Sequence, residues 1–270
     1  MVNEVAELST VSSESFLNTA ANLVDAARTK GITLRIMGAV AFRIHGRNMS
    51  ELHVRLERLG PGEKEFTDID LAAYSRDRNA MQRFFESQGF AADRNAQLAG
   101  GGLVWCQRHI YHEPKMGFHV DVFFDKLDMC HLIPFKNRLE ADYPTLPLAE
   151  LLLEKMQIVE INGKDLKDAI FLIRTHEIGE SDAETINGAL IAGLLAQEWG
   201  FYYTVKTNLD KLTKFSEKFR LTAEERADVI SKVEKLNVMI ESQPKGMSWK
   251  MRAKIGPSRK WYNDVEAYFD

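Results

Sequence analysis

The order of hydrophobic and polar residues predicts that helices and strands alternate over the first half of the chain. Hydrophobic residues recur every three or four positions in some stretches and every second position in others. The first spacing is typical of helices that bury one face, and the second is typical of half-exposed strands. The pattern predicts helices over 13–31, 39–46 and 76–90 and strands over 32–38, 51–59, 66–74, 102–111 and 118–124.

The pattern changes near Leu146. From there the hydrophobic residues follow helical spacing almost throughout, and Pro147 suits the first turn of a helix. Helices are predicted over 147–161, 163–176, 182–200, 208–219 and 222–240. We therefore expect an α+β fold in which residues 1–145 form an α/β domain and residues 146–270 form an all-helical domain.

Composition and charge narrow the class of protein. The 270 residues are 45% hydrophobic and 27% charged, which excludes a disordered or collagen-like chain. The net charge of −4 excludes general binding of polyanions, so any basic surface must be local. Cys106 and Cys130 are too few for a disulfide scaffold. Residues 1–10 lack a signal-peptide pattern, and the longest hydrophobic stretch, from Ala189, is too short to span a membrane, so we expect a cytoplasmic protein.

Asp68 and Asp70 lie two positions apart inside the predicted strand 66–74. Their side chains share one face of that strand, although aspartate is rare in strands and rarely buried alone. Two carboxylates a few ångströms apart repel each other by about 4 kcal/mol at an effective dielectric constant near 20. Either the pair lies on a solvated sheet edge, or a shared proton, a cationic side chain or a divalent cation offsets the repulsion. Carboxylate oxygens favour Mg²⁺ or Mn²⁺ over zinc.

Asp121 is a third candidate. It lies between two valines in the predicted strand 118–124, on the same face as His119. If this strand is adjacent to the strand of Asp68, three carboxylates meet on one patch. Such a patch suits two-metal phosphoryl chemistry, in which one cation activates the attacking oxygen and the other stabilises the leaving pyrophosphate.

The order of these parts resembles the nucleotidyltransferase superfamily that includes DNA polymerase β. The family pattern is a glycine turn that opens a helix, then Asp-x-Asp on a strand, then a single Asp on a later strand, and the matching stretches are IMGAVAFRIHG, TDIDL and VDVFF. The stretch LPLAELLLEKMQIVEINGKDLKDAIFLI is similar to the segment that follows the catalytic half in AbiE-type toxin nucleotidyltransferases. The resemblance covers residues 32–176 and implies a mixed sheet flanked by helices.

The resemblance also implies roles for particular residues. The amides of Gly38 and Ala39 at the start of a helix, together with Lys155, are expected to bind the phosphates of the nucleotide. A family run of the form Lys-Asp-x-x-Asp is matched by Lys164, Asp165 and Asp168.

Two features depart from the family pattern. The turn usually reads Gly-Gly or Gly-Ser, whereas Ala39 offers only its backbone N–H, which implies weaker phosphate binding. The interval from Gly38 to Asp68 is also longer than usual. The predicted strand 51–59 fills this interval, either as a hairpin arm that shapes the acceptor side or as an extension of the sheet.

Residues 244–261 carry six basic residues and no acidic one, with Trp249 and Trp261 among them. This basic segment either contacts RNA through phosphate contacts and base stacking, or packs its tryptophans onto the helical half. Cys106, His109 and His112 are spaced three apart, which points neighbouring members to opposite faces of a strand, so we do not expect them to bind zinc.

The sequence thus predicts a metal-dependent nucleotidyltransferase that moves a nucleoside monophosphate from a nucleoside triphosphate (NTP) to an acceptor hydroxyl. Asp68 and Asp70 are expected to bind Mg²⁺ or Mn²⁺, and Asp121 to complete the shell of the second cation and help deprotonate the acceptor. The toxin resemblance implies an RNA 3′ end as acceptor and an antitoxin protein as partner. The shortness of the longest hydrophobic stretch predicts that no membrane is contacted. The alternatives are a non-catalytic nucleotide- or partner-binding protein of the same fold, and an antibiotic-type enzyme that acts on a small molecule.

Overall fold

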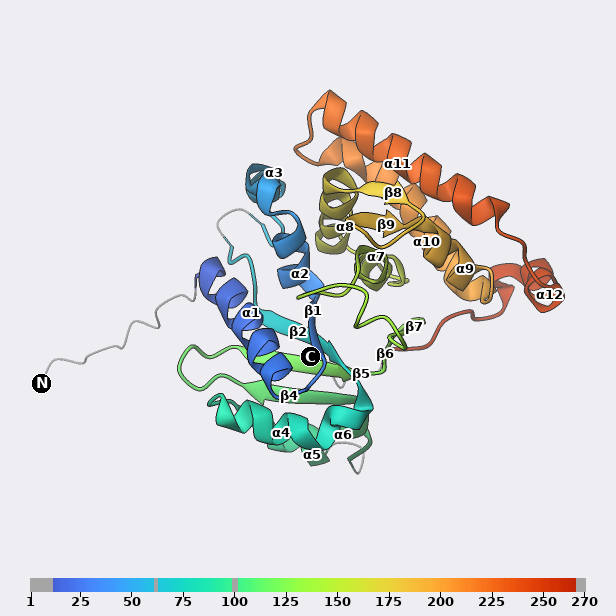
Figure 1. Ribbon diagram of the computed structural model, residues 1–270. Coiled ribbons are helices and arrows are strands. Elements are labelled where there is room, and N and C mark those ends of the chain that lie inside the picture. Colours follow the sequence, from blue (N-terminus) through green and yellow to red (C-terminus); the bar gives the residue numbers. More distant parts are fainter. Residues whose placement is uncertain (1–11, 61–62, 99–101, 266–270) are drawn as a thin grey trace, which may run out of the picture.

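A mixed sheet of five strands, in the order β1-β2-β5-β4-β3, forms the centre of the first half of the molecule (Figure 1). The computed structural model describes residues 12–60, 63–98 and 102–265. The strands are β1 (Leu34–Met37), β2 (Asp68–Ala73), β3 (Ala91–Ala92), β4 (Arg108–His112) and β5 (His119–Phe124). β2 and β5 run parallel, whereas the other neighbouring pairs run antiparallel.

Helices flank this sheet. They are α1 (Ser13–Thr29), α2 (Gly38–His45), α3 (Ser50–Leu56), α4 (Arg78–Ser87), α5 (Arg94–Leu98) and α6 (Leu103–Gln107), with single 3₁₀ turns over Arg47–Met49 and Ser75–Asp77. In Figure 1, α1 lies across the sheet and α4 lies beside β4. The hydrophobic face predicted for α1 is buried, namely Phe16, Leu17, Ala20, Leu23, Val24 and Ala27. The Ser12 side chain caps this helix by accepting a hydrogen bond from the N–H of Ser15.

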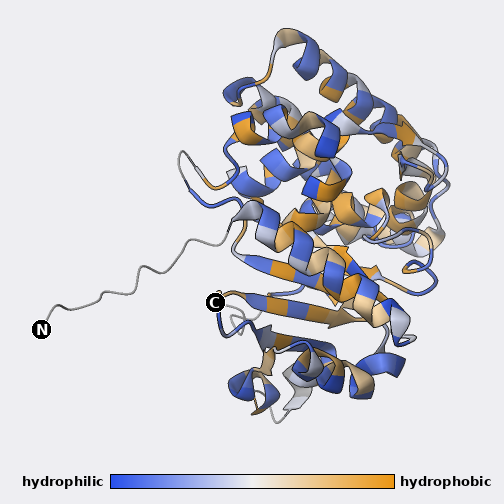
Figure 2. Ribbon diagram, turned by 60° about the vertical axis from the view of Figure 1, so that its left-hand side comes forward, coloured by the Kyte–Doolittle hydropathy of each residue, from blue (hydrophilic) through white to orange (hydrophobic). Residues whose placement is uncertain are grey.

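The second half is helical. Its helices are α7 (Leu148–Met156), α8 (Gly163–Thr175), α9 (Gly188–Leu195), α10 (Trp199–Phe215), α11 (Ala223–Ser242) and α12 (Met247–Ile255), with 3₁₀ turns over Ser216–Lys218 and Gly256–Ser258. A short antiparallel pair, β6 (Lys126–Asp128) and β7 (Leu132–Pro134), precedes them. Figure 2 shows hydrophilic and hydrophobic residues interspersed along these helices, as expected for helices that bury one face. The predicted fold class is confirmed, and the division of the chain at residue 145 stays a prediction.

One continuous hydrophobic core extends from α1 to α11 and joins the two halves. The contact between α2 and α8 is close. A Cβ at Gly46, directly after α2, would lie 2.1 Å from the ring of Phe171 on α8. Glycine at this position therefore lets α2 and α8 approach each other closely. In this way the helix that begins at Gly38 packs directly against the helical half.

The prediction of a strand over 51–59 is wrong, because residues 50–56 form α3. Leu52 and Leu56 are buried while Val54, between them, is 74% exposed, which is helical rather than alternating burial. The ring of His53 packs against Phe171, with centroids 4.9 Å apart. The segment therefore neither extends the sheet nor makes a hairpin arm. Residues 61–62, between this segment and β2, lie outside the described residues.

Two further predicted elements differ from the structure. Residues 103–107 form α6 rather than the start of a strand, since β4 pairs with β5 only from Arg108, opposite Phe123, onward. The single helix predicted over 182–200 is interrupted, because residues 185–187 form β9 (Thr185–Asn187), parallel to β8 (Glu177–Gly179). The Asn187 side chain accepts a hydrogen bond from the N–H of Leu190 and so sets the start of α9.

None of the described helices combines the length and hydrophobicity needed to cross a membrane. Residues 1–10, which lack a signal-peptide pattern, lie outside the described residues.

Candidate active site

Asp68, Asp70 and Asp121 lie on one face of two adjacent strands. In the parallel pairing of β2 and β5, Asp70 is opposite Asp121 and Asp68 is opposite His119. Opposed residues of neighbouring strands project to the same side of a sheet, so this register brings the three carboxyl groups together. The residues between them, Ile69 and Val120, project to the other side and are fully buried.

Asp70 has the most perturbed protonation of the three. Burial, followed by the charges of Asp68 and Asp121, raises the pKa of Asp70 to about 7. Lys155 and Arg108 act in the opposite direction without offsetting the rise. A carboxyl group with this pKa is partly protonated at neutral pH, and a cation that replaces the proton is bound favourably.

Asp121 is 1% exposed, and its Oδ2 accepts a hydrogen bond from the guanidinium of Arg108. The Nε2 atom of His119 lies 3.7 Å from Oδ2 of Asp121 and 3.8 Å from Oδ2 of Asp68, so the imidazole lies between the two carboxylates. Oδ1 of Asp121 is buried and has no hydrogen-bond partner among the described residues. Burial raises the pKa of Asp121 in spite of Arg108. This oxygen is therefore suited to accept a proton or to bind a cation.

Gly38 begins α2 directly against the carboxylate of Asp70. Its φ is +63°, and a Cβ at this position would lie 2.3 Å from Oδ2 of Asp70, so only glycine fits here. The N–H of Gly38 donates to Oε2 of the buried Glu154 at 3.0 Å. The amide that was predicted to bind phosphate is thus already paired with a carboxylate of α7. Ala39 remains the predicted phosphate donor of this turn.

Lys155 belongs to a buried network of ion pairs. Its Nζ lies 3.2 Å from Oδ1 of Asp165 and 3.1 Å from Oδ2 of Asp168. Arg58 donates from Nε to both oxygens of Asp168, at 2.8 and 3.0 Å. Burial by itself would lower the pKa of Lys155, but the carboxylates of Asp168 and Asp165 raise it by more. The net shift of the pKa is upward, so the ammonium stays charged. Lys164, the remaining residue of the predicted run, is exposed.

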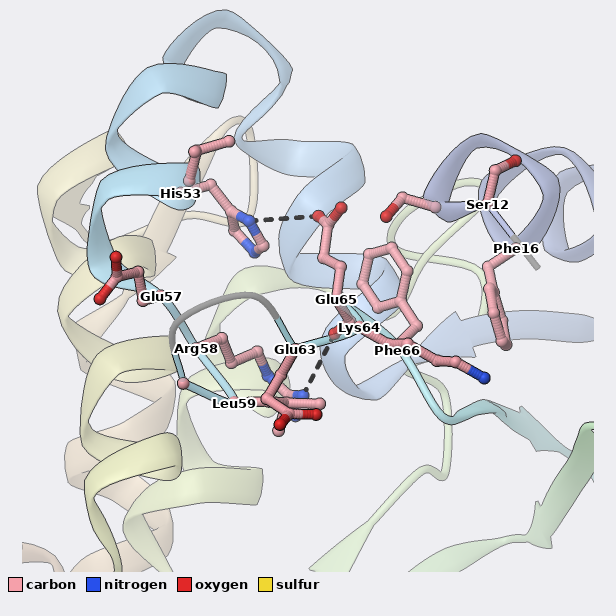
Figure 3. A pocket seen from close by; sticks show the side chains of 13 residues that line it. Ser12, Phe16, His53, Glu57, Arg58, Leu59, Glu63, Lys64, Glu65 and Phe66 are labelled. Atoms are coloured by element: carbon pink, nitrogen blue, oxygen red, sulfur yellow. Dashed lines mark hydrogen bonds and ion pairs between the residues drawn. The ribbon is translucent and has the colours of Figure 1, made fainter. Parts of the chain in front are cut away.

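A pocket of about 610 Å³ lies beside the segment that leads into β2 (Figure 3). Three carboxylates line it, those of Glu57, Glu63 and Glu65. Nδ1 of His53 lies 3.1 Å from Oε1 of Glu65, and Arg58 connects the pocket to the network of Lys155. Phe66, one of the two phenylalanines in its wall, precedes Asp68 by two residues.

The three aspartates fit a hard divalent cation in donor type and charge. A bound cation would give Oδ1 of Asp121 a partner, and it would offset the repulsion between charges that contributes to the raised pKa of Asp70. The three aspartates are too far apart in the structure, however, to bind one cation together. Within the part of the chain that the structure describes, Asp68, Asp70 and Asp121 do not bring one oxygen each within 4.8 Å of one another. Asp68 and Asp70 would hold a cation directly, and Asp121 would offer it Oδ1, because its Oδ2 is bonded to Arg108.

Sequence analysis missed two residues of this site, Arg108 and Glu154. The register of the β4–β5 hairpin could have found Arg108, because Ile110 is opposite Asp121 and Arg108 lies two residues away on the same face. The signal for Glu154 was weaker: it is one of two acidic residues spaced four apart in a helix whose other residues, apart from Lys155, are hydrophobic.

The tryptophans of the basic segment 244–261 are used within the protein. Nε1 of Trp249 donates to the carbonyl of Leu195, and Nε1 of Trp261 donates to Oγ1 of Thr204, both at 3.0 Å. Of the two interpretations of this segment, the structure therefore supports the packing of its tryptophans onto the helical half.

The raised pKa values predict that stability falls as the pH rises from about 6.5 to 8. Burial raises the pKa of Asp70 to about 7 and that of Glu154 to about 8, so the folded chain holds protons that the unfolded chain has lost. That contribution to stability is lost as the pH passes through the folded values, at up to about 1.4 kcal/mol per pH unit and group. Four histidines have a lowered pKa, namely His45, His53, His109 and His176. They make stability rise with pH, but only below about pH 6.5, where the unfolded histidines are protonated.

Urea unfolding of the metal-free protein at pH 6.5, 7.2 and 8 measures this effect. Glu154→Gln should flatten the decline, because the amide keeps an oxygen for the N–H of Gly38 and has no proton to lose. A wild-type midpoint that rises over this range would contradict the assignment.

No protein-family model and no curated protein matches the chain. Among solved structures, the chain is similar to the antibiotic-resistance factor ANT(2'')-Ia, at 12% identity, with 68% of this chain and 95% of that chain covered and a TM-score of 0.38. It is also similar to an antigenic nucleotidyltransferase-like protein from Paracoccidioides brasiliensis, at 13% identity, with 88% and 97% covered and a TM-score of 0.40. At this level of similarity neither protein decides the function of this one.

Proposed function

We propose that the protein is a metal-dependent nucleotidyltransferase that moves a nucleoside monophosphate from an NTP to an acceptor hydroxyl. The observation that carries the proposal is the register of β2 and β5, which puts Asp70 opposite Asp121 on the face of Asp68. Together with burial, this arrangement raises the pKa of Asp70 to about 7, as is common where charged groups are gathered for function. The resemblance of residues 32–176 to the nucleotidyltransferase superfamily agrees with it.

The side chains then take the following roles. Asp68 and Asp70 hold the Mg²⁺ or Mn²⁺ ion, which, when bound, offsets the charge of the triphosphate. Oδ1 of Asp121 accepts the proton of the acceptor hydroxyl. The acceptor oxygen bonds to the α-phosphorus while the bond from that phosphorus to the bridging oxygen breaks, and pyrophosphate leaves. Lys155 and the amide of Ala39 stabilise the phosphates.

The volume of the pocket of Figure 3, about 610 Å³, suits a small polyol or amine as the acceptor. Its lining carries both signs of charge, with Arg58 and Lys64 beside the three glutamates. The rings of Trp249 and Trp261 pack against Tyr202 and Tyr203 of α10, which supports a packing role for these tryptophans rather than base stacking. The RNA 3′ end and the antitoxin partner remain predictions from the sequence resemblance. Cys106 and Cys130 are both free thiols, which fits the predicted cytoplasmic location.

A specific observation favours a second candidate function, that of a non-catalytic nucleotide-binding protein. Asp121 is held by Arg108 and is 1% exposed, and the N–H of Gly38 is bonded to Glu154. Turnover requires an acceptor hydroxyl to reach the buried carboxyl group of Asp121, whereas nucleotide binding at Asp68 and Asp70 does not.

The test incubates the full chain with Mg²⁺ and each labelled NTP, in separate reactions with amino-sugar and polyol compounds, with total RNA and with the protein alone. We expect Mg²⁺-dependent labelling of the small molecules. Label in RNA would reassign the acceptor. The absence of label from every reaction, with Mg²⁺-dependent binding of NTP by calorimetry, would establish the second candidate instead.

A further inference from the structure

A second cluster of possible metal ligands lies away from the aspartates, between α2 and α8. His45 is the last residue of α2, His176 directly follows α8, and Glu184 directly precedes β9. One potential ligand atom from each lies within 4.8 Å of the other two. Among residues 12–60, 63–98 and 102–265, this is the one group of three His, Cys, Asp or Glu residues that meets this limit.

Both histidines are in the state that binds metal. Burial lowers the pKa of His45 and of His176, so both rings are neutral at physiological pH. Nδ1 of His176 lies 2.8 Å from Oγ1 of Thr175, whose hydroxyl donates to the carbonyl of Phe171, and 3.2 Å from the carbonyl oxygen of Leu172. Nδ1 can therefore act as the donor, and Nε2 then keeps its lone pair. A histidine that binds metal commonly donates its other ring N–H to a backbone carbonyl in this way. The two rings are 5.6 Å apart and nearly perpendicular.

Two carboxylates complete the surroundings. Glu184 has a φ of +52°, a conformation that a residue with a side chain rarely adopts. Oδ2 of Asp142 lies 3.6 Å from Nε2 of His45. Burial raises the pKa of Asp142, and the charge of Glu184 raises it further. The charge of Arg35 acts on the pKa of Asp142 in the opposite direction. Nε2 of His45 is 2.6 Å from Oγ1 of the fully buried Thr145, so zinc binding through this nitrogen requires Thr145 to change its rotamer.

We propose that His45, His176 and Glu184 bind one zinc ion, and that Asp142 becomes the fourth ligand through a movement of its side chain, since it does not meet the 4.8 Å limit with all three in the structure. Two imidazoles and two carboxylates in a four-coordinate arrangement suit zinc better than Mg²⁺, which prefers oxygen ligands and octahedral geometry. The ion is structural, since four protein ligands leave no open position. The ligands come from both halves of the chain, so the ion holds α2, the helix that opens at Gly38, against α8. This site does not depend on the proposed function.

Zinc binding is measured on the full chain after removal of metal with a chelator and dialysis, by competition with a chromophoric chelator in excess Mg²⁺. We expect one zinc ion per chain and a rise in the melting temperature that saturates at that ratio. Co²⁺ in place of zinc should give the visible absorption of a tetrahedral site with nitrogen and oxygen ligands.

Glu184→Gln is the decisive variant, because the side chain is exposed and the change should leave the fold intact. It should weaken zinc binding by at least about 10-fold. The matched control is Glu180→Gln, an exposed glutamate four residues earlier, which should bind zinc as the wild type does. His176→Gln should abolish binding, whereas His131→Gln, a change at another buried histidine, should not. Equal binding by Glu184→Gln and Glu180→Gln, or adventitious zinc only in the wild type, would overturn the proposal.

Discussion

Replacing Asp70 by asparagine is expected to reduce nucleotide transfer by about 10³-fold or more and, at the same time, to make the protein more stable at pH 8. The loss of activity follows because a cation and the triphosphate lose a carboxylate that contributes several kcal/mol. The gain in stability follows because the pKa of Asp70 is raised to about 7, so at pH 8 the folded state holds an unfavourable charge. Its removal should add on the order of 2 kcal/mol to the free energy of unfolding.

Asp121→Asn should be equally inactive and should gain less stability at pH 8 than Asp70→Asn. Burial raises the pKa of Asp121, so its charge is also unfavourable, but Arg108, whose side chain is 11% exposed, donates to this carboxylate. The weaker hydrogen bond to asparagine should offset the gain by about 1–3 kcal/mol. The two variants therefore separate a role in catalysis from a role in stability.

Transfer of labelled nucleotide and urea unfolding at pH 8 without Mg²⁺ measure both quantities. Asp210→Asn, a change at an exposed aspartate on α10, is the control and should alter neither. Full activity of Asp70→Asn would remove the proposed mechanism, and a lower stability of that variant would refute the electrostatic description of the site.

Replacing Asp168 by alanine is expected to destabilise the fold by about 3–5 kcal/mol. Asp168 is shared by Lys155 and Arg58, whose side chains are 12% and 10% exposed, and its removal leaves Arg58 buried without its partner carboxylate. The melting temperature should fall by on the order of 10 °C. Differential scanning calorimetry of the variant and the wild type measures the change.

Asp228→Ala provides the matched control. Asp228 also lies between two cations, 3.3 Å from Arg174 and 3.1 Å from Lys232, but its side chain is 32% exposed. Solvent screens this pair, so a loss of about 0–1 kcal/mol is expected. Similar losses from the two variants would show that burial does not set the strength of the network around Lys155.

Local spacing was sufficient for α1, α11 and the central strands, but not for α10, which runs from Trp199 to Phe215 across the interval between two predicted helices. The buried face of α1 follows directly from residues three or four positions apart. The same reasoning failed at residues 51–56, where a short segment fits both periods. Packing of His53 and Leu52 against distant parts of the chain selected the helix, because a segment of this length has little conformational preference of its own.

The amino-acid sequence alone was enough to identify the three aspartates as candidate ligands. It also indicated that Asp68 and Asp70 share one face of their strand, since the direction of a side chain along a strand is a local property. Only the tertiary structure decided that β2 and β5 are parallel neighbours in a register that sets Asp70 opposite Asp121. It likewise decided that Arg108 and Glu154 would enclose that site. Pairing between segments about fifty residues apart depends on how the whole core packs, and no short pattern encodes it.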